Sequence, residues 1–250
     1  MRDPRAIRAL MCLAVVWLAL AAMVRSLPQT SNSDDLPALA LARAVAGQVE
    51  QNVGPSSPDL ETQALDEMLR GSKGQIQRWV APPELVVLGS VMEYRRGDPA
   101  EYPATSEVLS DAEVNALIED LTAALATLTG DTFRNFSAIN RQQIPAGAVV
   151  RVTQPNRIVV GRYRDVQRHL NTIGLGGRAS RADGTITAAA ILLDADFDQT
   201  NVARRLLRTH ELGHALGYNH VQSRLSIMNP RIGPEFTEFD RRAASIAFQK

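Results

Sequence analysis

Residues 210–220 read His210-Glu211-Leu212-Gly213-His214-Ala215-Leu216-Gly217-Tyr218-Asn219-His220. Three of the four histidines in the chain therefore lie within this one stretch. His210 and His214 are four residues apart, so on a helix their imidazoles share a face and can bind one metal ion. Glu211 directly follows the first histidine, where its carboxylate can accept a proton from water activated by that metal. The stretch therefore predicts a catalytic metal site on a helix.

Gly217 and His220 extend this pattern beyond the end of the helix. After His214 the chain must turn sharply if His220 is to reach the same metal, and glycine readily adopts the left-handed conformation of such a turn. Three protein ligands leave a fourth position open for water or substrate, which is typical of catalytic zinc. We therefore expect one catalytic zinc ion, bound by His210, His214 and His220. The alternative is a surface helix whose histidines cluster by chance, and the fixed offsets of Gly217 and His220 argue against it.

This stretch resembles H-E-x-x-H-x-x-G-x-x-H, the zinc signature of the metzincin clan of metallopeptidases. Ser226-Ile227-Met228-Asn229-Pro230 resembles the methionine turn of that clan, with Met228 eight residues after His220. The resemblance implies an α+β fold with a mixed twisted sheet, a zinc-binding active-site helix, a methionine turn and a C-terminal helix. It also implies a zinc-dependent endopeptidase with Glu211 as general base, Met228 packed beneath the metal, and Pro230 in a wall of the substrate pocket.

The resemblance further places the edge strand of the clan at Ile186–Leu193. In these enzymes that strand pairs with the extended backbone of the substrate, which is a form of β-strand addition. Ile191, Leu192 and Leu193 are therefore expected to contact the substrate, which would be a protein or a peptide.

Within the clan the chain is most similar to the matrixins, including their short bacterial relatives, but it departs from them. It has no cysteine-switch motif, and only His169 remains for a second, structural zinc site. Val221 stands where astacins carry Glu and adamalysins carry Asp, and Pro230 stands where astacins and serralysins carry a tyrosine. Asp240 resembles an aspartate with which matrixins brace the active-site base, or it is simply a first-turn aspartate stabilised by the helix dipole.

Hydrophobic periodicity predicts three helices and several strands. The clearest helix is Ser110–Thr129, because Ser110 and Glu113 form a capping box and apolar residues then recur at helical spacing. The other helices are expected at Asn201–Leu216 and Glu238–Phe248, and the strands at Gln75–Val80, Glu84–Val91, Ala148–Val152, Arg157–Gly161 and Ile186–Leu193. Gly174–Gly177 is expected to be a loop. Grouped strands flanked by a few helices favour an α+β fold over a doubly wound sheet.

The N-terminal third predicts export followed by a non-catalytic segment. Three arginines precede an uncharged, mostly apolar run at 9–24, and Ala19-Leu20-Ala21 supplies small residues for cleavage. Residues 1–24 are therefore a signal peptide, or a signal anchor if they are retained. The protein would be secreted or periplasmic, or membrane-anchored through this segment alone. We interpret residues 25–74 as a linker or pro-segment with short helices at Pro37–Gln51 and Pro58–Arg70, and residues 75–250 as the catalytic domain.

The net charge argues against nucleic acid as a partner, and the residues at two positions argue against calcium. Basic and acidic residues balance at 27 each, so no net field favours nucleic acid. Asp194, Asp196 and Asp198 alternate in a way that suggests calcium, but Gln199 and Arg205 stand where an EF-hand loop needs glycine and glutamate. We therefore prefer strand-end and helix-cap roles for these aspartates. Three arginines are expected on the solvated face of the zinc helix: Arg204, Arg205 and Arg208.

Two other functions fit the same residues. A zinc-binding pseudo-peptidase would keep the metal ligands and serve as an interaction module, although no group required for hydrolysis is missing. A zinc amidohydrolase acting on non-peptide or cell-wall amides would use the same metal and the same base. Only substrate profiling separates this second alternative from a peptidase.

Overall fold

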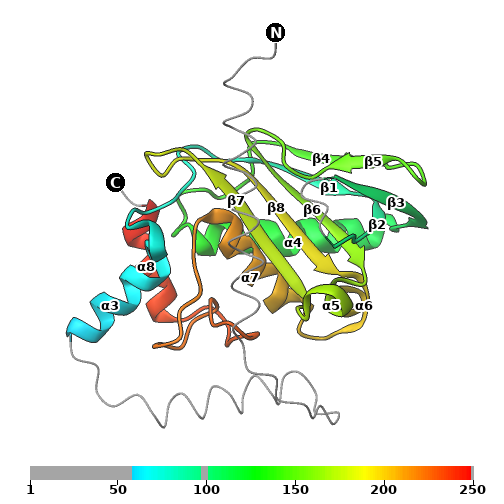
Figure 1. The fold of residues 1–250 in the computed structure, drawn as a ribbon. Coiled ribbons are helices and arrows are strands. Elements are labelled where there is room, and N and C mark those ends of the chain that lie inside the picture. Colours follow the sequence, from blue (N-terminus) through cyan, green and yellow to red (C-terminus); the bar gives the residue numbers. More distant parts are fainter. Residues whose placement is uncertain (1–57, 97–100, 249–250) are drawn as a thin grey trace, which may run out of the picture.

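The computed structural model describes residues 58–96 and 101–248, which form a mixed α+β structure (Figure 1). The helices are α3 (Pro58–Leu69), η2 (Gly71–Lys73), α4 (Asp111–Leu128), α5 (Val166–Leu170), α6 (Ala195–Thr200), α7 (Arg204–Leu216) and α8 (Glu238–Phe248). The strands are β1 (Glu84–Leu88), β2 (Ser90–Glu93), β3 (Glu101–Val108), β4 (Ile139–Gln142), β5 (Val149–Arg151), β6 (Arg157–Arg164), β7 (Gly174–Ser180) and β8 (Ile186–Asp194). The predicted signal segment 1–24 and the predicted helix Pro37–Gln51 lie outside the described residues. Within the described ranges, no helix has the length and apolarity to cross a membrane.

Strand β6 is the centre of a curled, eight-stranded mixed sheet. It pairs in parallel with β1 and β2 on one side and with β8 on the other. Beyond β1 lies β4, also parallel, while β3 and β5 continue from β2 as antiparallel strands. Strand β7 pairs antiparallel with β8, and within the described residues no other named strand pairs with its free edge.

Alternation along the strands places apolar side chains on both faces of the sheet. In β8, Ile191 and Leu193 belong to the main core beneath the helices, whereas Leu192 belongs to a second apolar cluster on the opposite face. In β1, Val87 and Val86 divide in the same way. Strands that are buried on both faces read as continuous apolar runs, which is why Ile186–Leu193 was recognisable as a strand.

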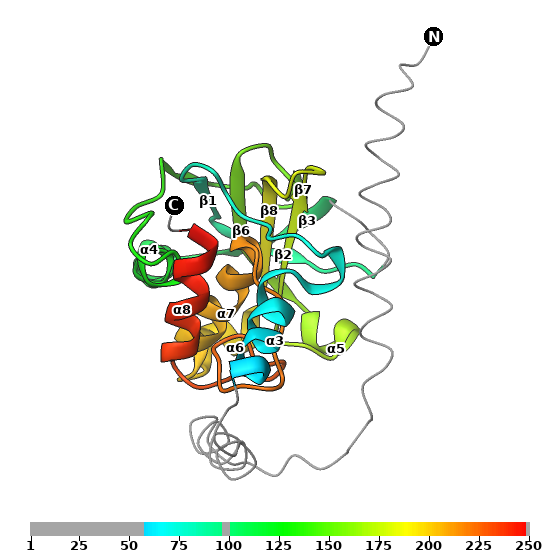
Figure 2. The same ribbon diagram turned by 90° about the vertical axis from the view of Figure 1, so that its left-hand side faces the viewer.

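Helix α4 forms where the sequence predicts it, because its start and its buried face are both encoded locally. Ser110 is the N-cap, and Ser110 and Glu113 exchange hydrogen bonds as the predicted capping box. Leu117, Leu121 and Leu125 are fully buried and recur at helical spacing, so one face of α4 packs into the main core. Helices α4 and α7 lie on the same face of the sheet (Figures 1 and 2).

The segment Gln75–Val80 was predicted as a strand, and this prediction is wrong. The segment makes only an isolated bridge, between Arg78 and Thr185. Its buried side chains reach other elements instead: Gln77 donates to Ser180 at the end of β7, and the indole of Trp79 donates to a carbonyl at the end of α7. Polar contacts of this kind have no periodic signature, so the apolar content of the segment was misleading.

Gly174–Gly177 was predicted as a loop, but it is the first half of β7. A Cβ atom added to Gly176 would lie 2.4 Å from the backbone oxygen of Glu211, and one added to Gly174 would lie 2.5 Å from the Glu211 carboxyl. Glycine is present here because the strand lies against α7 with no room for side chains. The same glycines weaken the strand signal in the sequence.

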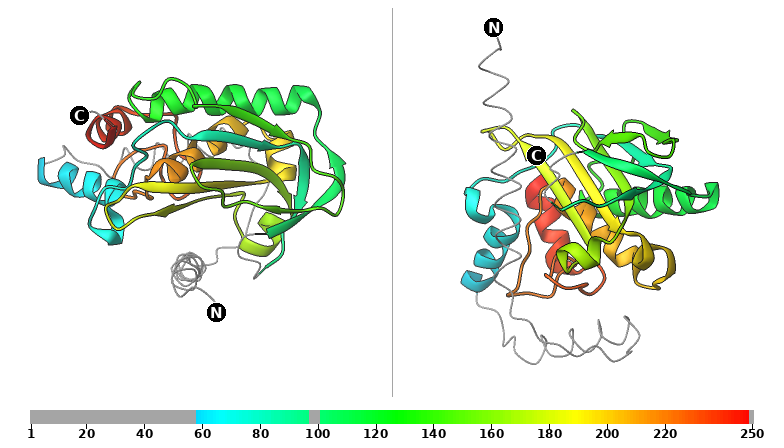
Figure 3. Two further views of the ribbon diagram at one scale, coloured as in Figure 1. Left: turned by 90° about the horizontal axis from the view of Figure 1, so that it is seen from above. Right: turned by 45° about the vertical axis from the view of Figure 1, so that its right-hand side comes forward.

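Helix α3 belongs to the same core as the sheet, although the sequence placed it in a linker or pro-segment. Ala64 and Met68 are fully buried in the main core. Figure 3 shows α3 (cyan) beside α8 (red) at one end of the molecule, and Glu61 of α3 forms an ion pair with Arg242 of α8. The packed body therefore includes residues 58–74 as well as the predicted domain.

Candidate metal centre

Helix α7 carries two of the three clustered histidines and ends at Gly217. It begins at Arg204 rather than at the predicted Asn201, whose side chain accepts a hydrogen bond from the Ala203 amide just before the helix. Gly217 has a φ of 127°, and a Cβ atom there would lie 1.9 Å from the carbonyl oxygen of Gln77. Backbone conformation and close approach both require glycine, as the sequence predicts, and the turn brings His220 back over the helix.

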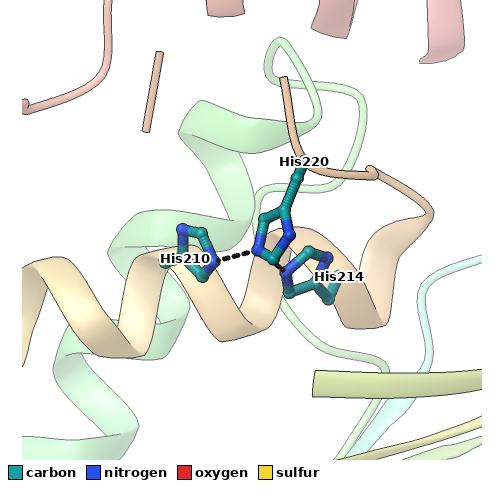
Figure 4. Close-up of side chains that lie close together, drawn as sticks. All are labelled: His210, His214 and His220. Carbon is teal, nitrogen blue, oxygen red and sulfur yellow. Dashed lines mark hydrogen bonds between the residues drawn. The ribbon is translucent and has the colours of Figure 1, made fainter. Parts of the chain in front are cut away.

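The three predicted ligands converge on one point (Figure 4). Nε2 of His220 lies 3.2 Å from Nε2 of His210 and 3.1 Å from Nε2 of His214. Tetrahedral zinc with bonds of 2.0–2.1 Å places its ligand nitrogens about 3.3 Å apart. Two of the three spacings are close to this value, and all three ligand atoms lie within 4.8 Å of one another, so the cluster could bind a metal ion.

Backbone carbonyls hold two of the rings with Nε2 facing this point. Nδ1 of His210 lies 2.7 Å from the carbonyl oxygen of Ile227, and Nδ1 of His214 lies 2.9 Å from that of Tyr218. A carbonyl can only accept, so each Nδ1 carries the proton and each Nε2 has a free lone pair. Such partners fix the tautomer and the orientation of metal-binding histidines.

All three imidazoles are neutral at physiological pH. Burial lowers the pKa of His210 to about 4, and the nearby His220 contributes to that shift. Burial also lowers the pKa of His214 well below its usual value, and that of His220 to a smaller extent. Neutral imidazole is the form that binds metal, so protons do not compete for the site near neutral pH.

Glu211 lies in a buried position against the glycines of β7. It is buried, and its Oε2 has no hydrogen-bond partner among the described residues. Burial raises its pKa to about 8, and the backbone amide of Gly176 offsets only part of this shift. Buried polar atoms without a partner are rare in folded proteins, and they mark positions that deserve a functional explanation.

Met228 lies against α7, and Asp240 holds the loop that contains Ser226 and Ile227. Met228 is fully buried, and a Cβ atom on Gly213, the residue before His214, would lie 2.4 Å from its Sδ. Asp240 accepts hydrogen bonds from the Ser226 hydroxyl and from the Ile227 amide, the latter at 3.0 Å. It therefore braces the loop that holds His210, whereas the sequence suggested a brace for Glu211 or a simple helix-end charge.

The predicted substrate contacts on β8 are not accessible. Ile191, Leu192 and Leu193 are at most 1% exposed, because β8 is paired on both sides, with β6 and with β7. The prediction that Ile186–Leu193 is an edge strand is therefore wrong, and the edge beside α7 is β7. Pro230, by contrast, is exposed in the loop after Met228.

Asp194, at the end of β8, and Asp198 form hydrogen bonds with other residues of the protein. Asp194 caps α6, where its side chain accepts from the Phe197 amide, as predicted. Asp198 is fully buried and accepts hydrogen bonds from Arg162 and Arg208 at 2.7–2.8 Å. Arg208 also bonds to Asp120 of α4 and is 1% exposed, so its predicted place on a solvated face is wrong. The sequence gives no signal for this pairing, because the partners are far apart along the chain.

Comparison with known proteins adds no family to these observations, because no protein-family model and no curated protein matches the chain. The functional assignment therefore depends on the site itself, and its best-defined part is the histidine cluster that could bind a metal ion.

Proposed function

We propose that this protein is a zinc-dependent endopeptidase of the metzincin type, similar to the matrixins, with one catalytic zinc ion. The convergence of the three histidines carries this proposal: Nε2 of His220 lies 3.1–3.2 Å from Nε2 of the other two, and the set supplies three ligands and leaves a fourth position for water or substrate. The donor set is three neutral imidazoles, two of them oriented by backbone carbonyls, which suits zinc. His210, His214 and His220 would hold the ion.

When bound, zinc supplies Lewis-acid chemistry, polarising a carbonyl and making water more acidic. The residues of the chain do the rest. Glu211, whose ionised form would be favoured by the charge of a bound zinc ion, would accept a proton from the attacking water and deliver it to the leaving amine nitrogen. Two observations support this role: Glu211 directly follows the first ligand in α7, and its buried Oε2 has no competing partner among the described residues.

Strand β7 supports a peptide as the substrate. Its outer edge has no strand partner among the described residues, so an extended peptide can pair with it and lengthen the sheet. Gly174 and Gly176 bring this edge against Glu211 and His214. A peptide on β7 would therefore lie beside the histidine cluster. Export through residues 1–24 is part of the same proposal, and the protein would be secreted or periplasmic.

The full chain and its Glu211→Gln variant test the function together. Zinc content is measured by elemental analysis, and cleavage is followed on a mixed peptide library. We expect one zinc ion per chain in both proteins, with turnover lower by at least about 10²- to 10⁴-fold in the variant. Retained turnover in Glu211→Gln contradicts the role of this residue. Bound zinc without any peptide cleavage favours a non-peptide amide substrate or a binding role, and absence of zinc refutes the metal site.

A further inference from the structure

Arg178 is a half-buried cation that reaches from β7 to the end of the zinc helix. Its Nε donates to Oε1 of Gln77 at 2.7 Å. Its Nη1 donates to the carbonyl oxygens of His214 at 2.9 Å and Tyr218 at 3.1 Å, and its Nη2 donates to Oδ1 of Asn219 at 2.9 Å. Burial lowers the pKa of the guanidinium to about 10, so it stays charged at neutral pH. Within the described residues it forms no ion pair with a carboxylate: its acceptors are neutral.

Three of these four acceptors, those on His214, Tyr218 and Asn219, belong to the segment that carries the second and third histidines. The Tyr218 carbonyl accepts from Arg178 and also from Nδ1 of His214, so one oxygen connects the guanidinium to a metal-binding ring. The His214 carbonyl lies at the C-terminal end of α7, where a positive charge is favourable because of the helix dipole. Arg178 therefore fixes both the end of the helix and the turn that follows it.

Asn219 extends this arrangement to α3. Oδ1 of Asn219 accepts a hydrogen bond from Arg178. Nδ2 of the same side chain donates to the Met68 carbonyl at 3.0 Å, and the backbone N–H of Asn219 donates to that carbonyl at 2.8 Å. Asn219 directly precedes His220, so the third histidine follows a residue that is held from two directions. A Cβ atom on Gly71 would lie 3.0 Å from the Asn219 side chain, which shows how closely the end of α3 approaches this turn.

We propose that Arg178 is a positioning residue of the metal centre, which holds His214 and His220 in binding geometry through Tyr218 and Asn219. The inference rests on the proposed zinc site and identifies a residue outside the ligand set that holds the ligands in place. The end of α3 completes this support through Met68, so residues assigned by sequence to a linker or pro-segment contribute to metal binding.

The chemistry of the side chain explains why arginine stands here. A planar guanidinium offers five N–H donors in a fixed fork, and Arg178 uses them on four acceptors from two segments of the chain. Lysine has a single nitrogen and cannot reach all four acceptors at once. Loss of an outer partner of metal ligands typically weakens metal binding by about 10- to 100-fold.

The test measures zinc affinity in the full chain by competition with a chromophoric chelator, at a temperature well below unfolding of the metal-free protein. We expect Arg178→Met to weaken the zinc Kd by about 10- to 100-fold and Arg178→Lys to recover part of that loss. The absorption spectrum of bound Co2+ should also change in Arg178→Met, because the ligand geometry relaxes. Arg181→Met is the matched control: this arginine is exposed just after β7, and its loss should leave the Kd within about twofold.

The outcomes separate this inference from the proposed function. A wild-type chain that binds no zinc overturns both. Tight zinc binding by wild type and by folded Arg178→Met alike overturns only the positioning role, even if the variant unfolds at a lower temperature. If Arg178→Met does not fold, Asn219→Ala takes its place, since it breaks the contacts with Arg178 and Met68. An unchanged Kd in that variant overturns the proposal equally.

Discussion

Helix α4 and strand β7 both pack against α7, but they do so in opposite ways. Helix α4 contributes long apolar side chains such as Leu121 and Leu125 to the shared core. Strand β7 contributes backbone, because any side chain at Gly174 or Gly176 would overlap with Glu211. A side-chain contact can adjust to a change of shape, whereas a contact between two backbones cannot. The helix that carries the histidine cluster therefore has one neighbour that tolerates changes of shape, α4, and one that does not, β7.

The charged groups on α7 follow the same division. On the α4 side, Arg208 is buried and paired with Asp120 and Asp198. On the β7 side, Glu211 is buried and its Oε2 has no partner among the described residues. Breaking a buried ion pair is strongly destabilising, whereas a buried carboxyl with an unsatisfied oxygen already destabilises the fold and is a candidate for a functional role.

The largest expected effect on stability comes from removing the ion pairs of Arg208 on the α4 side. Arg208→Met should lower the free energy of unfolding by about 3–5 kcal/mol, because Asp198 loses one of its two arginines while remaining buried. Chemical denaturation monitored by circular dichroism measures this loss. Arg205→Met on the same helix is the control, since this side chain is 73% exposed and its removal should change stability by less than about 1 kcal/mol. Equal effects of the two substitutions would show that the buried network does not stabilise the α4 side.

On the β7 side, burial of Glu211 should make the free energy of unfolding of the metal-free protein depend on pH. The pKa of Glu211 is raised by burial to about 8 in the folded state. Its protonated form therefore favours folding below the unfolded-state pKa, and this contribution is lost as the pH rises towards 8.

Glu211→Gln lacks this titration. Its stability relative to wild type should therefore increase by roughly 3 kcal/mol between pH 5 and pH 8. Parallel denaturation curves for the two proteins, with a chelator present, cancel the titration of the histidines. A constant difference across this range would mean that Glu211 is solvated or paired.

The backbone contact of β7 is tested by adding one carbon atom. Gly176→Ala places Cβ 2.4 Å from the Glu211 backbone oxygen, so the strand must move away from α7, at a cost of about 2–3 kcal/mol. Gly177→Ala is the matched control, because nothing lies within 4 Å of its added Cβ. Denaturant midpoints of both variants give the comparison. A similar small effect at both positions would contradict the tight contact.

The smallest effect is expected where shape changes within the α4 contact. Leu121→Met nearly conserves volume in a side-chain interface and should cost less than about 1.5 kcal/mol. The zinc Kd should not change, because α4 repacks without moving α7. Chelator competition checks this second point, and a weaker Kd would show that α4 is as intolerant a neighbour as β7.

The same contrast explains what could be predicted from sequence. Helix α4 could be predicted from local signals, namely the capping box of Ser110 and Glu113 and the face of leucines. Helix α8 was predicted at its observed bounds. Strand β7 was missed, because its glycines serve a contact with residues that are distant in sequence. The apolar run of β8 was recognised as a strand, but pairing on both its sides, which makes it internal, has no signature in its own residues.

Some features of the candidate site could also be predicted from the sequence, and others could not. Convergence of the three histidines follows from their spacing and from Gly217, so the sequence was sufficient for it. The carbonyls of Ile227 and Tyr218 that orient the rings are backbone atoms, which every residue carries, so no residue type marks them. Arg178 gave no signal either, because an isolated arginine in a glycine-containing segment reads as a solvated residue until its acceptors are known.

The docking of α3 has a consequence for the order in which the chain assembles. Met68 and Asn219 are 151 residues apart, and Glu61 and Arg242 are 181 apart. Contacts over such separations close large loops, whose entropy must be lost before the contact forms, and they are slow to establish. Helix α3 is synthesised well before these partners, which follow it by 151 and 181 residues. Refolding should therefore form α4 first and a zinc-competent turn last.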